Sequence, residues 1–337
     1  MYKYLKISLL IFSVQTITAQ VKRVEDFNII LPEYKMESNY RQLQFIETRN
    51  DTVNYGIVQK GAFNKRAAVL PTIPFEKQFQ NVFSVLKSKE NVATDTLLIQ
   101  LRDLKFAEVT GAFSETGYFF LRANAYAKAG AAYYLLNTVD IAEEVSGMDV
   151  TQKNYKNASR IINKFISQSM SGTKGEAPAL TYAQILDIEK YEKANLPLYA
   201  NTGLIDGFYG SFNAFQEQKP SVKNTRLVWK KNKIKDIEFV NYKGEYSSLN
   251  PPEIYAVVEN GKGYIHTEYG FYELARRDND YYYTGKVRST ADNGSVIAAT
   301  VMFGVIGGLI ASNNTDVYEV KIDYLNGSTI QVKKIKN

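Results

Sequence analysis

LLIQLRDLKFAE (residues 97–108) is the first of three strand-like stretches that decide the fold of this chain. It is followed by YFFLRANAYA (residues 118–127) and AAYYLLNTVD (residues 131–140), with short glycine-containing turns between the stretches. In the first stretch, Leu97 and Ile99 alternate with Leu98. Because successive side chains of a strand point to opposite faces of a sheet, each stretch turns one set of residues inward. The alternation predicts a three-stranded antiparallel meander.

The residues around this meander carry a helical repeat. Large apolar side chains recur at Phe75, Phe79, Phe83 and Leu86, which places them on one face of a helix. Similar patterns predict further helices over residues 155–166 and 182–193, and two short strands over residues 43–47 and 53–58. Helices packed on an antiparallel sheet make an α+β domain, which we place at residues 20–195.

Strands and turns dominate residues 196–337. Ser211 is expected to cap a short helix, and hairpins are expected around Asn260-Gly261, across residues 276–280 and around Asn326-Gly327. The Asn-Gly pairs favour the positive φ angles of a tight β-turn. We therefore expect a β-rich second domain, built as a small antiparallel β barrel or a strongly twisted sheet.

A glycine-rich apolar run, VIAATVMFGVIGGLIA (residues 296–311), interrupts this second domain. As a helix it would be about 24 Å long, shorter than the hydrocarbon core of about 30 Å. Gly304 and Gly308 would share a face and allow close contact with another helix, with Gly307 beside them. A buried insertion in the fold is the favoured interpretation, and a contact with a membrane or another subunit is the alternative.

The first residues have the pattern of a secretory signal peptide. Lys3 and Lys6 precede an apolar stretch of about eight residues, and we expect cleavage after Ala19. The protein is therefore expected to be exported, to the periplasm or to the outer membrane. The absence of cysteine excludes disulfides, thiolate metal sites and cysteine nucleophiles.

The charge pattern contains one basic cluster. The formal net charge is +6, of which the leader contributes two lysines, and this excess is too small to argue for nucleic acid. The cluster holds Lys230, Lys231, Lys233 and Lys235 beside the single tryptophan, Trp229. A cluster of this kind could contact anionic lipid or polysaccharide, whereas a solvated strand edge protected by lysines is the simpler interpretation. The candidate interaction surface consists of Trp229, Lys230, Lys231, Lys233, Gly304, Gly307 and Gly308.

Catalytic patterns are weak throughout. His266 and Glu268 form an H-x-E pair, but zinc deaminases that use this pair also need cysteine ligands, which the chain lacks. The residues Asp278-Asn279-Asp280 begin like a calcium loop, yet the tyrosines that follow do not supply the remaining ligands, which favours a turn. Two carboxylate pairs could serve glycoside hydrolysis, namely Glu143 with Glu144 and Glu108 with Glu115, but the sequence shows no cleft that would hold them. No catalytic, metal or cofactor residue is assigned.

The whole pattern resembles one group of proteins. The leader, LLIQLRDLKFAEVTGAFSETGYFFLRANAYAK (residues 97–128), GFYGSFNAFQEQKPS (residues 207–221) and the late glycine-rich run are similar to uncharacterised exported proteins of Bacteroidetes-type bacteria. The resemblance implies a place in a Gram-negative envelope and supplies no activity. We therefore expect a non-catalytic accessory or binding module for another envelope component, with an envelope protein or a membrane surface as partner. A cell-surface hydrolase or carbohydrate-active enzyme is the alternative.

Overall fold

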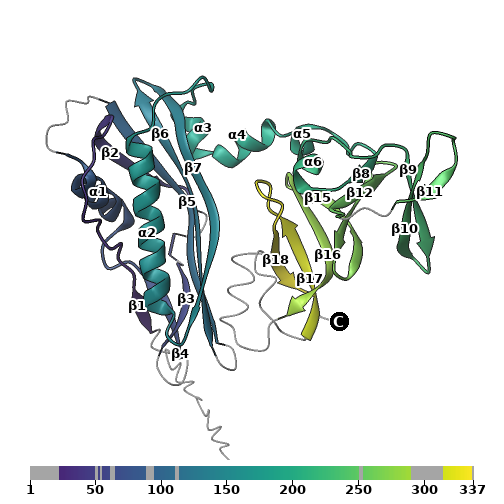
Figure 1. Ribbon diagram of the computed structural model, residues 1–337, viewed down its shortest axis with the longest axis horizontal. Coiled ribbons are helices and arrows are strands. Elements are labelled where there is room, and N and C mark those ends of the chain that lie inside the picture. Colours follow the sequence, from purple (N-terminus) through teal and green to yellow (C-terminus); the bar gives the residue numbers. More distant parts are fainter. Residues whose placement is uncertain are drawn as a thin grey trace, which may run out of the picture.

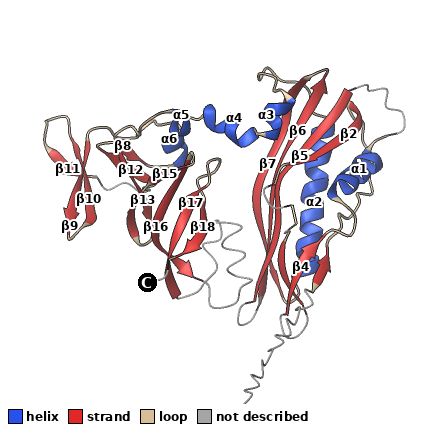
Figure 2. Cartoon of the chain, turned by 180° about the vertical axis from the view of Figure 1, so that it is seen from behind, coloured by secondary structure: helices blue, strands red, loops and turns tan. Residues whose placement is uncertain are grey.

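The computed structural model describes residues 23–49, 52–53, 55–60, 65–88, 95–110, 114–249, 253–289 and 314–335. Two lobes are joined by short helices (Figure 1). The first lobe contains one large sheet with helices on one face, and the second lobe contains three smaller sheets (Figure 2). The leader (residues 1–19) and the apolar run (residues 296–311) lie outside the described residues, so their interpretation stays a prediction.

The large sheet is built around three long strands. Its strands are β1 (Val24–Asp26), β2 (Tyr40–Glu47), β3 (Gly56–Lys60), β4 (Lys65–Leu70), β5 (Asp95–Thr110), β6 (Glu115–Ala129) and β7 (Ala132–Gly147). They lie in the order β1-β4-β3-β5-β6-β7, with β2 also paired to β5. Strands β5, β6 and β7 form an antiparallel meander, as their alternation predicts. The early strands β2 and β3 both run parallel to β5.

Two helices, α1 (Phe75–Leu86) and α2 (Thr151–Met170), cover one face of this sheet. The four apolar residues of the α1 repeat are all buried there. They share a core with the inward side chains of the strands, including Leu101, Leu104 and Phe119. The other face of the sheet carries Leu98, Tyr126 and a group of charged residues, and we call it the open face.

Short helices lead from the first lobe to the second. The single helix expected over residues 182–193 is instead two, α3 (Tyr182–Leu186) and α4 (Ile188–Ala194), followed by α5 (Pro197–Ala200). The helix breaks at Asp187, whose backbone is non-helical with φ −115° and ψ 44°. Ile185 and Ile188, on either side of the break, both pack on the open face beside Tyr126.

The second lobe consists of three sheets. Its elements are β8 (Gly207–Tyr209), α6 (Phe212–Gln216), β9 (Thr225–Lys230), β10 (Lys233–Val240), β11 (Tyr246–Ser248), β12 (Ala256–Glu259), β13 (Lys262–Thr267), β14 (Gly270–Glu273), β15 (Ala275–Arg277), β16 (Asp280–Ser289), β17 (Asn314–Ile322) and β18 (Thr329–Lys334). The sheets are ordered β11-β10-β9, β14-β13-β12-β8 and β15-β16-β17-β18. None of them closes on itself within the described strands, so the barrel alternative is wrong there.

The local predictions for this lobe hold in part. Ser211 caps α6 by accepting a hydrogen bond from the Ala214 N–H, and the hairpins at Asn260-Gly261 and Asn326-Gly327 are present. The hairpin expected across residues 276–280 is smaller than predicted. Strand β14 pairs with β13, and only the short strand β15 pairs with β16 around Asp278-Asn279.

The two lobes have separate apolar cores. Within the described residues, each apolar cluster belongs either to the first sheet with its helices or to the second lobe. The lobes are therefore held together mainly by polar contacts, which are described below. Of the helices that the structure describes, none combines the length and apolar character needed to cross a membrane.

Candidate functional site

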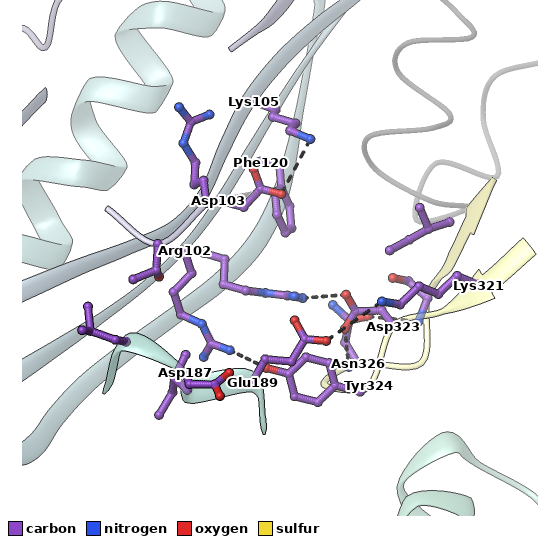
Figure 3. A pocket seen from close by; sticks show the side chains of 17 residues that line it. Arg102, Asp103, Lys105, Phe120, Asp187, Glu189, Lys321, Asp323, Tyr324 and Asn326 are labelled. Atoms are coloured by element: carbon purple, nitrogen blue, oxygen red, sulfur yellow. Dashed lines mark hydrogen bonds and ion pairs between the residues drawn. The ribbon is translucent and has the colours of Figure 1, made fainter. Parts of the chain in front are cut away.

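A cavity of about 320 Å³ lies between the open face of the first sheet, the α3–α4 turn and the end of β17 (Figure 3). Most of its lining is charged or polar. The lining residues are Thr48, Arg49, Arg102, Asp103, Lys105, Phe120, Arg122, Leu186, Asp187, Ile188, Glu189, Lys321, Asp323, Tyr324, Asn326, Ser328 and Ile330. We call this space the interlobe cavity.

A β-bulge supplies two of the cavity's charged residues. The pairing of β5 with β6 shifts register between Leu101 and Asp103. Leu101 and Leu104 both remain in the core, so Arg102 and Asp103 both line the cavity on the open face. Strict alternation would have sent Asp103 to the same side as Leu101. Bulges re-aim side chains in this way, and the sequence offers no pattern that marks this one.

Arg102 joins the first sheet to α4 and to the second lobe. Its two terminal nitrogens donate to the two carboxylate oxygens of Glu192, at 2.9 and 2.6 Å. The Tyr324 hydroxyl donates to the same carboxylate at 2.5 Å and also contacts Arg102. This bidentate arrangement fixes both the distance and the orientation of the arginine relative to α4.

Arg122 makes a second junction between the lobes. It donates to both carboxylate oxygens of Asp140 on β7, at 2.9 and 3.1 Å, and to Asp323 at 3.0 Å. The amide of Asn326 donates to Asp140 at 3.0 Å. The turn after β17 is thereby attached to the open face of the first sheet.

A third junction lies next to α4. Lys193 is buried and lies 2.6 Å from both Glu189 and Asp280. Lys321 on β17 lies 2.6 Å from the other oxygen of Asp280. Buried charges are stable in this setting because each has an opposite charge within hydrogen-bonding distance. We refer to the three junctions together as the interlobe clamp.

The clamp changes the pKa values of its members. Burial alone would lower the pKa of Arg122, but the carboxylates of Asp323 and Asp140 raise it overall. Burial would raise the pKa of Glu189, whereas Lys193 and Lys321 hold it below its ordinary value. Asp103 behaves differently. Burial raises its pKa overall, although Lys105, 4.0 Å away, acts to lower it. The cavity thus holds one carboxyl with a raised pKa and one with a lowered pKa.

The basic cluster lies at the other end of the molecule, in the three-stranded sheet β9–β11, which projects from the second lobe (Figure 1). Strands β9 and β10 are joined by the two-residue turn Lys231-Asn232, and Lys230 faces Lys233 across it. We call residues 229–235 the basic hairpin. Residues 222–248 contain seven basic and three acidic side chains, a net charge of +4 against +6 for the whole chain. Most of the net charge is therefore concentrated in this projection.

The basic hairpin is exposed. Trp229 keeps 47 % of its surface in solvent, although its ring also meets that of Tyr264 edge-on at 5.6 Å. The two acids of β10 are engaged elsewhere, since Glu238 pairs with Arg226 at 2.6 Å and Asp236 accepts from the Ser248 hydroxyl. Among the described carboxylates, none forms an ion pair with the four lysines of the hairpin.

The other sequence candidates do not assemble into a reactive site. His266 is exposed at the end of β13, where it packs against Phe271, and Glu268 lies in the following turn. The described residues contain no group of three or more potential metal-ligating His, Asp or Glu side chains. Asp278 and Asn279 form a tight turn with φ angles of 49° and 61°, and Asp280 belongs to the interlobe clamp.

The proposed carboxylate pairs also lie away from the cavity. Glu143 and Glu144 are adjacent on β7 and point to opposite faces of the sheet. Glu108 is buried beside α2, and burial raises its pKa to about 7. The three glycines Gly304, Gly307 and Gly308 fall outside the described residues. Sequence reasoning located the basic hairpin and missed the interlobe cavity, whose members are scattered along the chain.

Comparisons with known proteins give little further information. No protein-family model matches the sequence, and no curated protein matches it. Among solved structures, a protein of the DUF330 family from Xanthomonas campestris aligns with 50 % of this chain and 99 % of its own chain, with a TM-score of 0.28 and 7 % identity. A similarity at this level supports no argument about fold or function.

Proposed function

We propose that this protein is an exported, non-catalytic envelope protein that binds another component of the envelope through the basic hairpin. The single observation that carries the proposal is the exposed Trp229 beside four lysines whose neighbouring acids are paired elsewhere. Tryptophan is enriched at binding surfaces because it combines a large apolar ring with a polar N–H. The uncompensated lysines favour a partner that carries negative charge.

The interlobe clamp supports a binding role for the hairpin. Its arginines and buried lysine connect the lobes, and the projecting sheet lies at the end of the second lobe that is farthest from the first lobe (Figure 2). The charges around the cavity are therefore largely used for structure. In this proposal the first lobe and the clamp serve as a support that presents the hairpin.

Retention of the purified protein on envelope fractions tests this function. Membranes and cell-wall material from the source cells are incubated with the wild type and with the double variant Lys230→Gln/Lys231→Gln. The matched control is Lys156→Gln/Lys164→Gln, which removes the same charge from exposed positions on α2. We expect the first variant to lose retention and the control to keep it. Equal retention of both variants would show that the hairpin is not the binding surface.

A hydrolase is the second candidate, and one observation favours it. Asp103 and Glu189 line the same cavity with pKa values shifted in opposite directions, which is the arrangement that acid and base carboxylates need. Incubation with glycan substrates separates the two functions. We expect no turnover by the wild type, whereas turnover that is lost in Asp103→Asn and in Glu189→Gln would establish the enzyme instead.

A further inference from the structure

We infer that the anionic component is a phospholipid bilayer, and that the basic hairpin docks on its surface with the Trp229 ring at the level of the headgroups. This inference rests on the proposed function and specifies its partner. It is supported by the position of the hairpin, by its backbone conformation and by the types of its side chains.

The position suits contact with an extended surface. The sheet β9–β11 lies at one end of the long axis of the molecule, away from the first lobe (Figure 1). The β9–β10 turn has only two residues, so the four lysines and Trp229 fall within one compact hairpin end. A flat surface can approach such an end without meeting the first lobe.

The backbone of the turn carries an unfavourable residue. Lys231 has φ 50° and Asn232 has φ 60°, both in the left-handed region. Asparagine, aspartate and glycine suit such positions, and two other turns of the second lobe use them at Asn260-Gly261 and Asp278-Asn279. Lysine is disfavoured in this region, because the Cβ atom of an L-residue comes too close to the following carbonyl oxygen. A lysine at a position with this conformational cost favours a role for its charge.

The side-chain types favour a lipid surface over a shaped pocket on a protein. All four basic residues of the hairpin are lysines. Arginine provides the planar, bidentate geometry that recognises an individual carboxylate or phosphate, whereas lysine acts as a flexible point charge. Point charges suit a fluid array of anionic headgroups, which has no fixed register. Tryptophan also suits a lipid surface, because its amphipathic ring prefers the interface between membrane and water.

The expected strength of vesicle binding follows from the charge of the hairpin. Each basic residue near an anionic bilayer contributes about 1 kcal/mol, which is about a fivefold change in binding. Removal of two lysines should therefore weaken vesicle binding by about 25-fold. Added salt should weaken binding as well, because exposed charges are screened over about 10 Å at ordinary ionic strength.

The single tryptophan of the chain is a built-in reporter for this contact. The intact protein is mixed with vesicles of phosphatidylglycerol and phosphatidylcholine, with vesicles of phosphatidylcholine alone, and with soluble polyphosphate. We expect a blue shift of the Trp229 emission only with the anionic vesicles, and quenching when their acyl chains are brominated. Lys230→Gln/Lys231→Gln should shift the titration by about 25-fold, and Lys156→Gln/Lys164→Gln should leave it unchanged.

The outcomes separate the partner from the function. Retention on envelope fractions that depends on the hairpin, without any shift of Trp229 emission on anionic vesicles, would overturn the bilayer inference and leave the proposed function standing. Binding to polyphosphate with the same affinity as to vesicles would also overturn it, in favour of a soluble or cell-wall polyanion. Retention that does not depend on the hairpin, together with unchanged Trp229 emission on anionic vesicles, would overturn both the bilayer inference and the proposed function. Circular dichroism of each variant without vesicles checks that it is folded.

Discussion

Arg122, on β6 in the middle of the meander β5-β6-β7, lies 3.0 Å from Asp323, which follows β17 in the second lobe, although 201 positions separate them in the chain. Both side chains are largely buried. With Arg102 and Lys193, this pair joins two lobes whose apolar cores are separate in the described residues. The relative placement of the lobes therefore depends on charges.

Replacement of Arg122 by alanine should loosen this junction. Asp140 and Asp323 would lose their shared cation, and breaking a buried ion pair from one side costs about 3 kcal/mol. Thermal unfolding measures the loss, and small-angle scattering measures the accompanying increase in the radius of gyration. Lys219→Ala is the control, because its pair with Glu217 is exposed and should change stability by less than about 1 kcal/mol. Equal effects of the two substitutions would show that the clamp does not hold the lobes.

Glu108 should make stability depend on pH. Burial raises its pKa to about 7 from an ordinary 4.5, while hydrogen bonds from Gln59 and Thr151 act in the opposite direction and the nearby Glu115 and Asp149 raise it further. Between about pH 4.5 and pH 7, Glu108 is therefore protonated in the folded state and ionised in the unfolded chain. Its stabilising effect is complete below about pH 4.5 and is lost as the pH rises through 7.

Glu108→Gln isolates this contribution. The amide cannot ionise, so the variant should match the wild type at low pH and exceed its unfolding free energy by at most about 3 kcal/mol above neutral pH. Chemical denaturation at a series of pH values measures the difference. A constant difference across the range would mean that Glu108 does not titrate in this window.

Lys231→Asn should stabilise the protein. The substitution places a residue that tolerates the left-handed region at φ 50°, for a gain of about 1 kcal/mol. Lys233→Asn removes the same charge from the extended strand β10 and should give no such gain. Denaturant midpoints compare the two. Identical midpoints would show that the turn at Lys231 is not strained.

Gly56→Ala should destabilise the first lobe. Gly56 has φ 109°, and a Cβ atom there would collide with the backbone carbonyl of Phe106 on β5. Gly130 provides a control, since it also has a positive φ of 61° but open space around it. We expect Gly56→Ala to cost at least about 2 kcal/mol and Gly130→Ala about 1 kcal/mol, as measured by thermal unfolding. A larger loss at Gly130 would contradict the close approach of β3 to β5.

Local patterns account for what the sequence predicts well. Alternation identified β5, β6 and β7, helical spacing identified α1 and α2, and Asn-Gly pairs identified two hairpins. These features depend on neighbours in the chain. The parallel pairing of β2 and β3 with β5 depends on distant partners, and the three-residue strand β1 is too short to carry a pattern.

The candidate sites differ in the same way. The basic hairpin could be located because Trp229 and its lysines are consecutive or nearly so. The interlobe cavity could not, because a single charge such as Asp323 resembles any solvated acid until its partner is known. The bulge that turns Asp103 toward the cavity and the break at Asp187 arise from packing between elements. Neither has a signature in the residues themselves.

We propose the basic hairpin as the surface through which the protein binds the envelope. Hydrogen–deuterium exchange of the purified protein, with and without envelope membranes, tests it most directly because it reports on every segment at once. We predict slower exchange confined to the basic hairpin (residues 229–235), with the cavity residues around Arg102 and Asp323 unchanged. Protection around the interlobe cavity without protection of the hairpin would contradict the claim.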